Sequence, residues 1–136
     1  MALGSRLTLA YVAVHRPADA LRVADELRGR TGGTYSDRML ALWGESIARA
    51  QLGDGDARAG VDAANAIAAT TDAPLEHAVA ALARARVFEA LGDEDAAEAK
   101  DDAERQLRTL GIDASGWMLL FDGALEGVRP ADAATR

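Results

Sequence analysis

Two stretches of the sequence carry the strongest structural signal: LALWGESIARAQLGD (residues 40–54) and VAALARARVFEALGD (residues 79–93). Both end on Leu-Gly-Asp, and the two endings lie 39 residues apart. Within each stretch apolar residues recur at helical steps of three and four, and they do not alternate as in a strand. A Gly directly after the last apolar residue is typical of a helix end. Each stretch therefore predicts a helix with the same ending.

Turn-forming residues divide the chain into segments of about 12–18 residues, which suits helices and is too long for strands. Taken in pairs, the segments predict an all-α domain over residues 1–126. It has three helical hairpins at about 3–31, 36–71 and 74–111 and a terminal helix at about 115–126, followed by a disordered tail at 127–136. The dividing turns are His15-Arg16-Pro17, Thr31-Gly32-Gly33, Gly53-Asp54-Gly55, Thr71-Asp72-Ala73-Pro74, Gly92-Asp93 and Gly111.

Residues at the segment ends support these boundaries. We expect Ser36-Asp37 to cap the third helix, and Thr71-Asp72 followed by Pro74 to open the fifth. Three glycines follow a Leu that ends an apolar stripe and are predicted to terminate helices. They are Gly53, Gly92 and Gly111.

The hairpins repeat with a period near 39 residues. Trp43 precedes Leu82 by 39 positions, and Gly44 precedes Ala83 by the same interval. Self-similarity at this period predicts an array of stacked hairpins, because one hairpin cannot bury its apolar face alone. Gly44 and Ala83 are expected where facing helices come closest.

The second hairpin resembles a tetratricopeptide (TPR) repeat. Leu40, Trp43-Gly44 and Ile47 have the spacing of that family's first helix. The third hairpin matches through Val79 and Leu82-Ala83, but it has Arg86 where an apolar residue is expected. In the second helix of the second hairpin, the small residues of the motif fall on Ala59, Ala63 and Ala66.

The 39-residue period departs from the family's period of about 34. The resemblance, over residues 3–111, is to the long degenerate TPR-like repeats of bacterial transcriptional regulators and multidomain signalling proteins. It implies a right-handed α-α superhelix whose first helices line a groove for a protein partner. The family's groove positions fall on Arg38, Glu45, Arg49, His77, Arg84 and Phe88.

The three arginines of this candidate groove suggest an acidic partner, because a guanidinium can bind a carboxylate through two hydrogen bonds. An acidic peptide or a chain terminus would fit. The alternative is that these arginines are ordinary surface charges, since Lys100 is the only lysine and Arg is the default base of this chain.

The most apolar run of the chain, Trp117 to Phe121, lies in the predicted terminal helix. We expect this helix to cover the open end of the last hairpin, on the side of Ala103, Leu107 and Leu110. A docking or dimerisation helix is the alternative, because the run has no polar face. The candidate residues for either role are Trp117, Met118, Leu120 and Phe121.

Little in the sequence indicates catalysis or metal binding. The chain has no cysteine and two histidines, His15 and His77, neither with a ligand at metal-binding spacing. The acidic residues at 93–104 do not have the spacing of a Ca²⁺ loop and predict a solvated helix face. No cofactor, no metal site and no enzymatic activity are expected.

The remaining expectations concern partners and location. A net charge of −7 argues against direct binding to nucleic acid, and no apolar segment is long enough to cross a membrane. A cytoplasmic location is therefore expected. We expect a non-enzymatic protein–protein interaction or regulatory scaffold module, part of a larger bacterial regulator or signalling protein. A homodimerisation module and a small-molecule sensor domain are the alternatives. The uncapped start would expose Leu3, Leu7 and Tyr11.

Overall fold

The fold is all-α, as predicted. The computed structural model describes residues 2–29 and 33–130, with side chains described from residue 4 onward. Over these residues the chain forms helices and turns and no strand. The helices are α1 (Ala2–Ala13), α2 (Pro17–Arg28), α3 (Tyr35–Gln51), α4 (Ala57–Ala69), α5 (Pro74–Leu91), α6 (Ala96–Leu110) and α7 (Ser115–Leu125).

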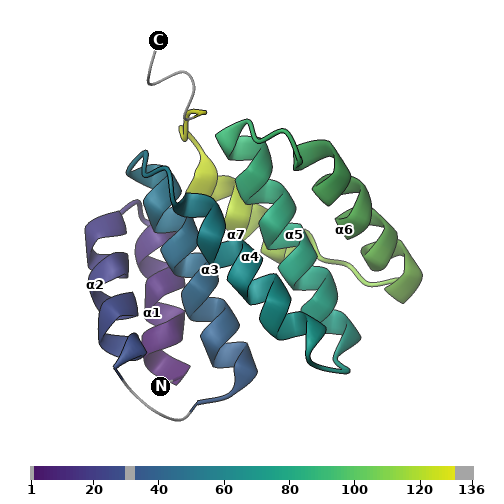
Figure 1. Cartoon of the computed structure of the whole chain (residues 1–136), viewed down its shortest axis with the longest axis horizontal. Helices are drawn as coiled ribbons and strands as arrows, with labels where there is room; N and C mark the ends of the chain where they lie inside the picture. Colours follow the sequence, from purple (N-terminus) through teal and green to yellow (C-terminus); the bar gives the residue numbers. More distant parts are fainter. Residues whose placement is uncertain (1, 30–32, 131–136) are drawn as a thin grey trace.

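The first six helices form three consecutive hairpins, α1–α2, α3–α4 and α5–α6 (Figure 1). The hairpins stack in sequence order, because α2 contacts α3 and α4 contacts α5. The first helices of the hairpins also meet directly, α1 with α3 and α3 with α5. Helix α7 leaves this order and passes behind the array in the view of Figure 1. No helix of the described residues is long and apolar enough to span a membrane.

Most predicted helix ends are confirmed. Gly92 and Gly111 adopt left-handed conformations, with φ of 67° and 64°, directly after their helices. The predicted Ser36-Asp37 cap is wrong in its position. Thr34 caps α3 by accepting the backbone N–H of Asp37, whose carboxylate accepts the Thr34 N–H in return. This reciprocal pair satisfies two N–H groups that a helix start leaves without partners.

Glycine allows the closest helix contacts. A Cβ added at Gly44 would lie 2.6 Å from the Cβ of Thr8, so α3 and α1 can approach this closely only because position 44 has no side chain. A Cβ at Gly60 would lie 2.8 Å from the carbonyl oxygen of Leu42, where α4 crosses α3. The prediction that Gly44 marks a close contact is confirmed, and Gly60 is a second such position that the sequence argument missed.

The small residues that match the TPR motif in α4 do not form its buried side. Ala59, Ala63 and Ala66 are exposed, whereas the buried face is formed by Ala57, Gly60, Val61, Ala64 and Ala68. Alanine occurs on every side of this helix, so its spacing does not identify the buried side.

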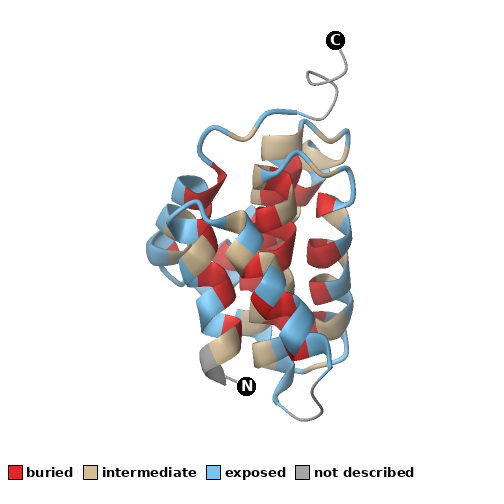
Figure 2. Ribbon diagram, turned by 90° about the vertical axis from the view of Figure 1, so that its left-hand side faces the viewer, coloured by how far each residue is buried: buried red, intermediate tan, exposed pale blue. Residues whose placement is uncertain are grey.

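The core is continuous through the three hairpins and α7 (Figure 2). Its largest fully buried side chains include Phe88, Phe121, Met39 and Ile47. At the N-terminal end, Leu7 is 37% exposed and Tyr11 is half-buried beneath Arg16, while the side chain of Leu3 lies outside the described residues. The predicted disordered tail lies partly outside them as well; within its described part, Val128 packs against the core.

Replacing Gly44 with Leu should lower the free energy of unfolding by about 1–3 kcal/mol or more, because the new side chain meets the backbone of α1 at Thr8. Ala83→Leu should act in the same direction, since Ala83 is fully buried. The control is Gly55→Ala, where a Cβ meets nothing within 4 Å and the backbone is not left-handed. This change should be neutral or slightly stabilising, because Ala reduces the conformational freedom of the unfolded chain. Urea unfolding measures all three. Equal stability of wild type and Gly44→Leu would contradict the close contact.

Candidate functional site: an apolar cleft beside helix α7

Helix α7 lies on the side of the array formed by the first helices of the hairpins, here called the inner face. Its main contacts are with α5, α1 and α3. This corrects the expectation that it would cover the open end of the last hairpin near Leu107. The apolar run of α7 instead packs across all three hairpins.

An aromatic cluster holds α7 on the inner face. Phe121 of α7 is fully buried, and its ring centroid lies 6.1 Å from that of Trp43 on α3 in an edge-to-face arrangement. Trp117 also meets Trp43 edge-to-face, at 5.6 Å, and stacks on Phe121 at 5.8 Å. Such geometries contribute about 0.5–1.5 kcal/mol per pair beyond the burial of apolar area.

Polar contacts fix the C-terminal half of α7. The side-chain amide of Gln51 donates to the carbonyl of Val12, at 2.8 Å, and to that of Ala124, at 2.7 Å. It thereby joins α3, α1 and α7. The ring of His15 lies 3.1 Å from the carbonyl oxygen of Gly123, and Arg86 forms an ion pair with Asp122 at 3.2 Å. Neither His15 nor Gln51 was singled out for this role by the sequence argument.

The N-terminal half of α7 borders an open cleft of about 470 Å³ between α1, α3 and α5. Apolar and aromatic side chains dominate its lining, as is usual for binding sites of this size. They are Leu9, Met39, Leu40, Trp43, Leu75, Val79, Trp117 and Leu120. The polar lining residues are Arg6, Ser36 and Glu76.

Two charged side chains of the cleft have unused interaction capacity. The indole N–H of Trp43, by contrast, is itself buried, and it has no hydrogen-bond acceptor among the described residues. Arg6 of α1 and Glu76 of α5 form no ion pair with any described residue. Since α3 separates α1 from α5 in the array, these opposite charges lie at opposite borders of the cleft.

The six residues predicted to line a groove do not lie in this cleft. On α3, positions 38, 45 and 49 point about a third of a turn away from Met39 and Trp43, because successive residues are separated by about 100°. On α5, positions 77, 84 and 88 point about half a turn away from Leu75 and Val79. The groove position carried over from the family therefore corresponds to a different side of each helix.

On that side, the predicted groove residues bind neighbouring elements of the chain. Glu45 is 7% exposed and forms ion pairs with Arg28 of α2 and Arg49. Arg49 also pairs with Asp54 at 2.7 Å. Arg38 alone is exposed and forms no ion pair among the described residues.

Arg84 belongs to a network of ion pairs between α4, α5 and the turn before α6, and Phe88 packs beneath its arginines. The guanidinium groups of Arg58 and Arg84 lie 4.4 Å and 4.5 Å from the ring centroid of Phe88, which is fully buried. Asp62 accepts from both cations. Hydrogen bonds to Asp62 first, then to Asp95, raise the pKa of Arg58 above its usual value.

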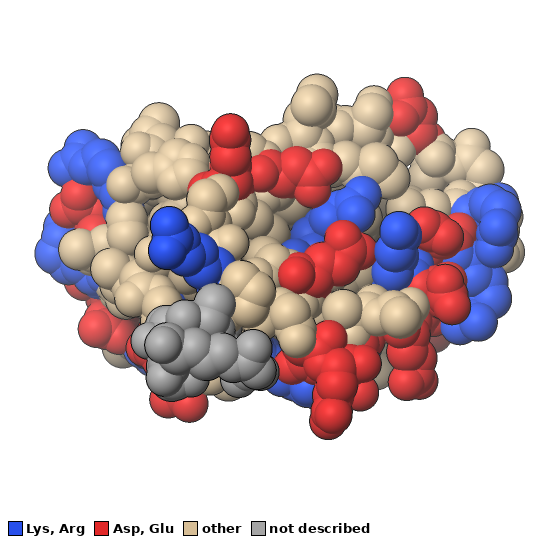
Figure 3. Space-filling view, turned by 90° about the horizontal axis from the view of Figure 1, so that it is seen from above, with Lys and Arg blue, Asp and Glu red and all other residues tan. Residues whose placement is uncertain are grey.

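The acidic cluster at residues 93–104 is thus partly neutralised, because Arg58 also binds Asp93. Figure 3 looks onto the end of the molecule with the turns at 52–56 and 92–95, and basic and acidic side chains alternate there. Within the described residues, no group of three or more His, Asp or Glu side chains is arranged to hold a metal ion.

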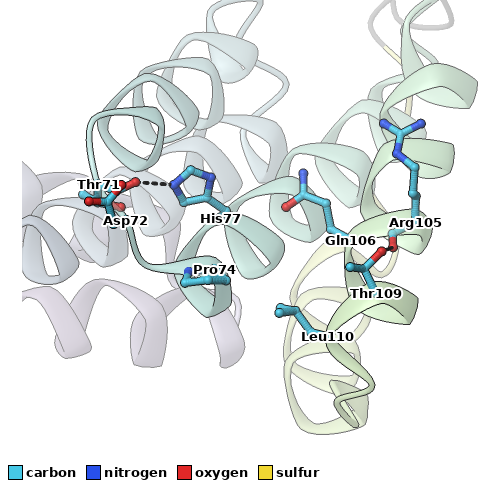
Figure 4. Close-up of a pocket in the computed structure, with 8 residues that line it drawn as sticks. All are labelled: Thr71, Asp72, Pro74, His77, Arg105, Gln106, Thr109 and Leu110. Carbon is cyan, nitrogen blue, oxygen red and sulfur yellow. Dashed lines mark hydrogen bonds between the residues drawn. The ribbon is translucent and has the colours of Figure 1, made fainter.

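A second cleft, of about 480 Å³, separates the α4–α5 turn from the C-terminal end of α6 (Figure 4). His77 lies on one side, with its ring 2.8 Å from the carbonyl oxygen of Thr71, and Gln106 and Thr109 lie on the other. Thr109 donates to a backbone carbonyl, and the lining residue Arg105 pairs with Asp102. Because these polar groups are already hydrogen-bonded within the chain, this cleft is the weaker candidate.

Comparisons with protein-family models, with curated proteins and with solved structures gave no match for this chain.

Replacing Phe121 with Ala should lower the free energy of unfolding by roughly 3–5 kcal/mol, because the ring is fully buried between α7 and α3. Leu52→Ala is the control and should change it by less than about 0.5 kcal/mol, because Leu52 is 54% exposed and lies outside α7 and the cleft. Tryptophan fluorescence during urea unfolding reports on both variants. Similar small effects of the two changes would mean that α7 is not packed as described.

Proposed function

We propose that this chain is a non-enzymatic protein–protein interaction or regulatory scaffold module, and that it binds its partner at the apolar cleft beside α7. The observation that carries the proposal is the apolar surface at this place. The open cleft is bordered by Leu75, which is 51% exposed, and the helix beside it carries Leu119, which is 76% exposed. Apolar side chains gathered at a surface favour a binding role.

The chemistry of the cleft favours binding over catalysis. Its lining includes one carboxylate, Glu76, and one hydroxyl group, Ser36, but no histidine. An acid–base or nucleophilic mechanism needs a nucleophile or a proton acceptor held by a second group. The helical framework suits a groove that accepts part of another protein, since α7 itself occupies the inner face in that manner.

The setting of the module follows from its resemblance to TPR-like repeats. Three stacked hairpins with a period near 39 residues are consistent with a right-handed superhelix of that type. We therefore propose a cytoplasmic role within a larger bacterial regulator or signalling protein. Arg49 and Arg84 are not available to an acidic partner, because both form ion pairs within the chain. Arg6 lines the cleft and has no ion pair among the described residues, so we propose that an acidic group of a partner binds there.

A small-molecule sensor is the second candidate, and one observation favours it. The cleft of about 470 Å³ has a mostly apolar lining with a few polar groups, as small-molecule sites usually do.

Leu75→Ser should reduce binding of protein partners, because it places a hydroxyl group at the border of the apolar cleft. Leu52→Ser is the matched control, since Leu52 is 54% exposed and does not line the cleft. Both substituted residues are exposed, so both variants should retain their helicity. The measurement is the amount of each protein cross-linked to tagged wild type and variants in the source cell.

A protein recovered with wild type and Leu52→Ser, but not with Leu75→Ser, would support the proposal. Equal recovery of every protein with both variants would contradict it. Native mass spectrometry of the same samples distinguishes the sensor, which would retain a bound small molecule that Leu75→Ser loses.

A further inference from the structure

We propose that the occupant of the cleft is a second copy of this chain, related to the first by a two-fold axis that passes beside α7. This inference rests on the proposed function and names its partner. It is carried by three features of the cleft and its borders: the outward side of α7, the charges of Arg6 and Glu76, and the charge of the whole chain.

The outward side of α7 has the character of a buried surface. Asp122 is the only charged residue of this helix, whereas the outward side of α6 is charged. Gly116, Leu119 and Gly123 follow one another along the exposed side of α7, at helical steps of three and four. A Cβ at either glycine would meet nothing within 4 Å, so a second helix could approach closely there. A helix without a polar face is typically covered on all sides.

A projecting side chain, Leu119, lies next to the cleft on the same surface. Leu119 is the most exposed large apolar side chain described, at 76%. Leu120, the next residue, lines the adjoining cleft together with Leu40 and Leu75. In a two-fold dimer every contact occurs twice, so Leu119 of each copy would enter the cleft of the other.

The two charges at the cleft borders are complementary to the same two charges of a second copy. Arg6 lies at the α1 border and Glu76 at the α5 border, and neither forms an ion pair with any described residue. A two-fold axis through the cleft exchanges its borders. It would therefore place Arg6 of one copy opposite Glu76 of the other, and the reverse pair on the far side. A different partner would need an acid and a base at these two places, while a second copy carries both by symmetry.

The net charge of the chain restricts which faces could meet. Two copies that each carry a charge of −7 repel one another. The exposed side of α6 is acidic, with Glu98, Asp101 and Glu104, and is unsuitable for self-association. The cleft lining has one cation and one anion, so it is neutral overall and can approach its own copy.

The experiment is analytical ultracentrifugation of the full chain over a series of concentrations. We expect reversible association to a mass of twice 14.2 kDa. Leu119→Ser should weaken the dimer by about tenfold or more, because each interface loses two buried leucines. Leu52→Ser, at a site that is 54% exposed and lies outside the cleft, should leave the dissociation constant unchanged. Circular dichroism confirms that each variant keeps its helicity.

A charge exchange tests the two-fold arrangement directly. Arg6→Glu and Glu76→Arg should each weaken the dimer by about tenfold, because each places like charges opposite one another twice. The double variant should restore the wild-type dissociation constant. Net charge alone would give a different pattern for the single variants, because Glu76→Arg lowers the negative charge of the chain and should then strengthen association. Weakening by both single changes therefore indicates that positions 6 and 76 face each other across the two-fold axis.

A monomer at every concentration would overturn the inference, as would a dimer that is insensitive to Leu119→Ser or a double variant without rescue. The same experiments separate failure of this inference from failure of the proposed function. If wild type is monomeric yet still recovers a protein that Leu75→Ser loses, the cleft is a binding site for another partner and only the second copy is excluded. If no protein and no second copy binds, both are wrong.

Discussion

The packing of Trp117 and Phe121 against Trp43 is the contact on which the organisation of this molecule depends. The three hairpins also pack directly on one another, through α1 with α3 and α3 with α5 among other contacts. The aromatic cluster, however, places α7 across the first helices of all three and so joins parts of the chain that are far apart in sequence. It also creates the cleft, because Trp43 and Trp117 form part of its lining.

The two sides of the array differ in how they are held. On the inner face the contacts are apolar and aromatic, with the amide of Gln51 as the polar link between α1, α3 and α7. On the opposite side, ion pairs join the elements, as where Asp62 binds both Arg58 and Arg84 above Phe88. Most charged side chains there have partners within the chain, Arg38 being an exception, whereas the cleft combines two unpaired charges with apolar surface.

The sequence predicts the existence and ends of the helices because these depend on local chemistry. Gly92, which follows the last apolar residue of its stripe, ends α5 in a left-handed conformation, and Pro74 begins the same helix. The buried side of α4 was not predictable, since alanine occurs all round that helix. The predicted groove residues lie on a different side of α3 and α5 from the cleft, because they were carried over from the TPR-like pattern and not from the apolar side chains of this chain. The apolar run near Phe121 indicated burial, but local sequence does not specify which surface covers it.

The most direct test of this account is the position of the α7 aromatics, measured by nuclear Overhauser effects between side-chain protons. The chain has two tryptophans, so their ring signals are readily assigned. We predict strong effects between the rings of Trp43 and Trp117, whose centroids lie 5.6 Å apart. Effects from Trp117 to Ala103 and Leu107 of α6, with none to Trp43, would instead place α7 over the end of the array and contradict the account.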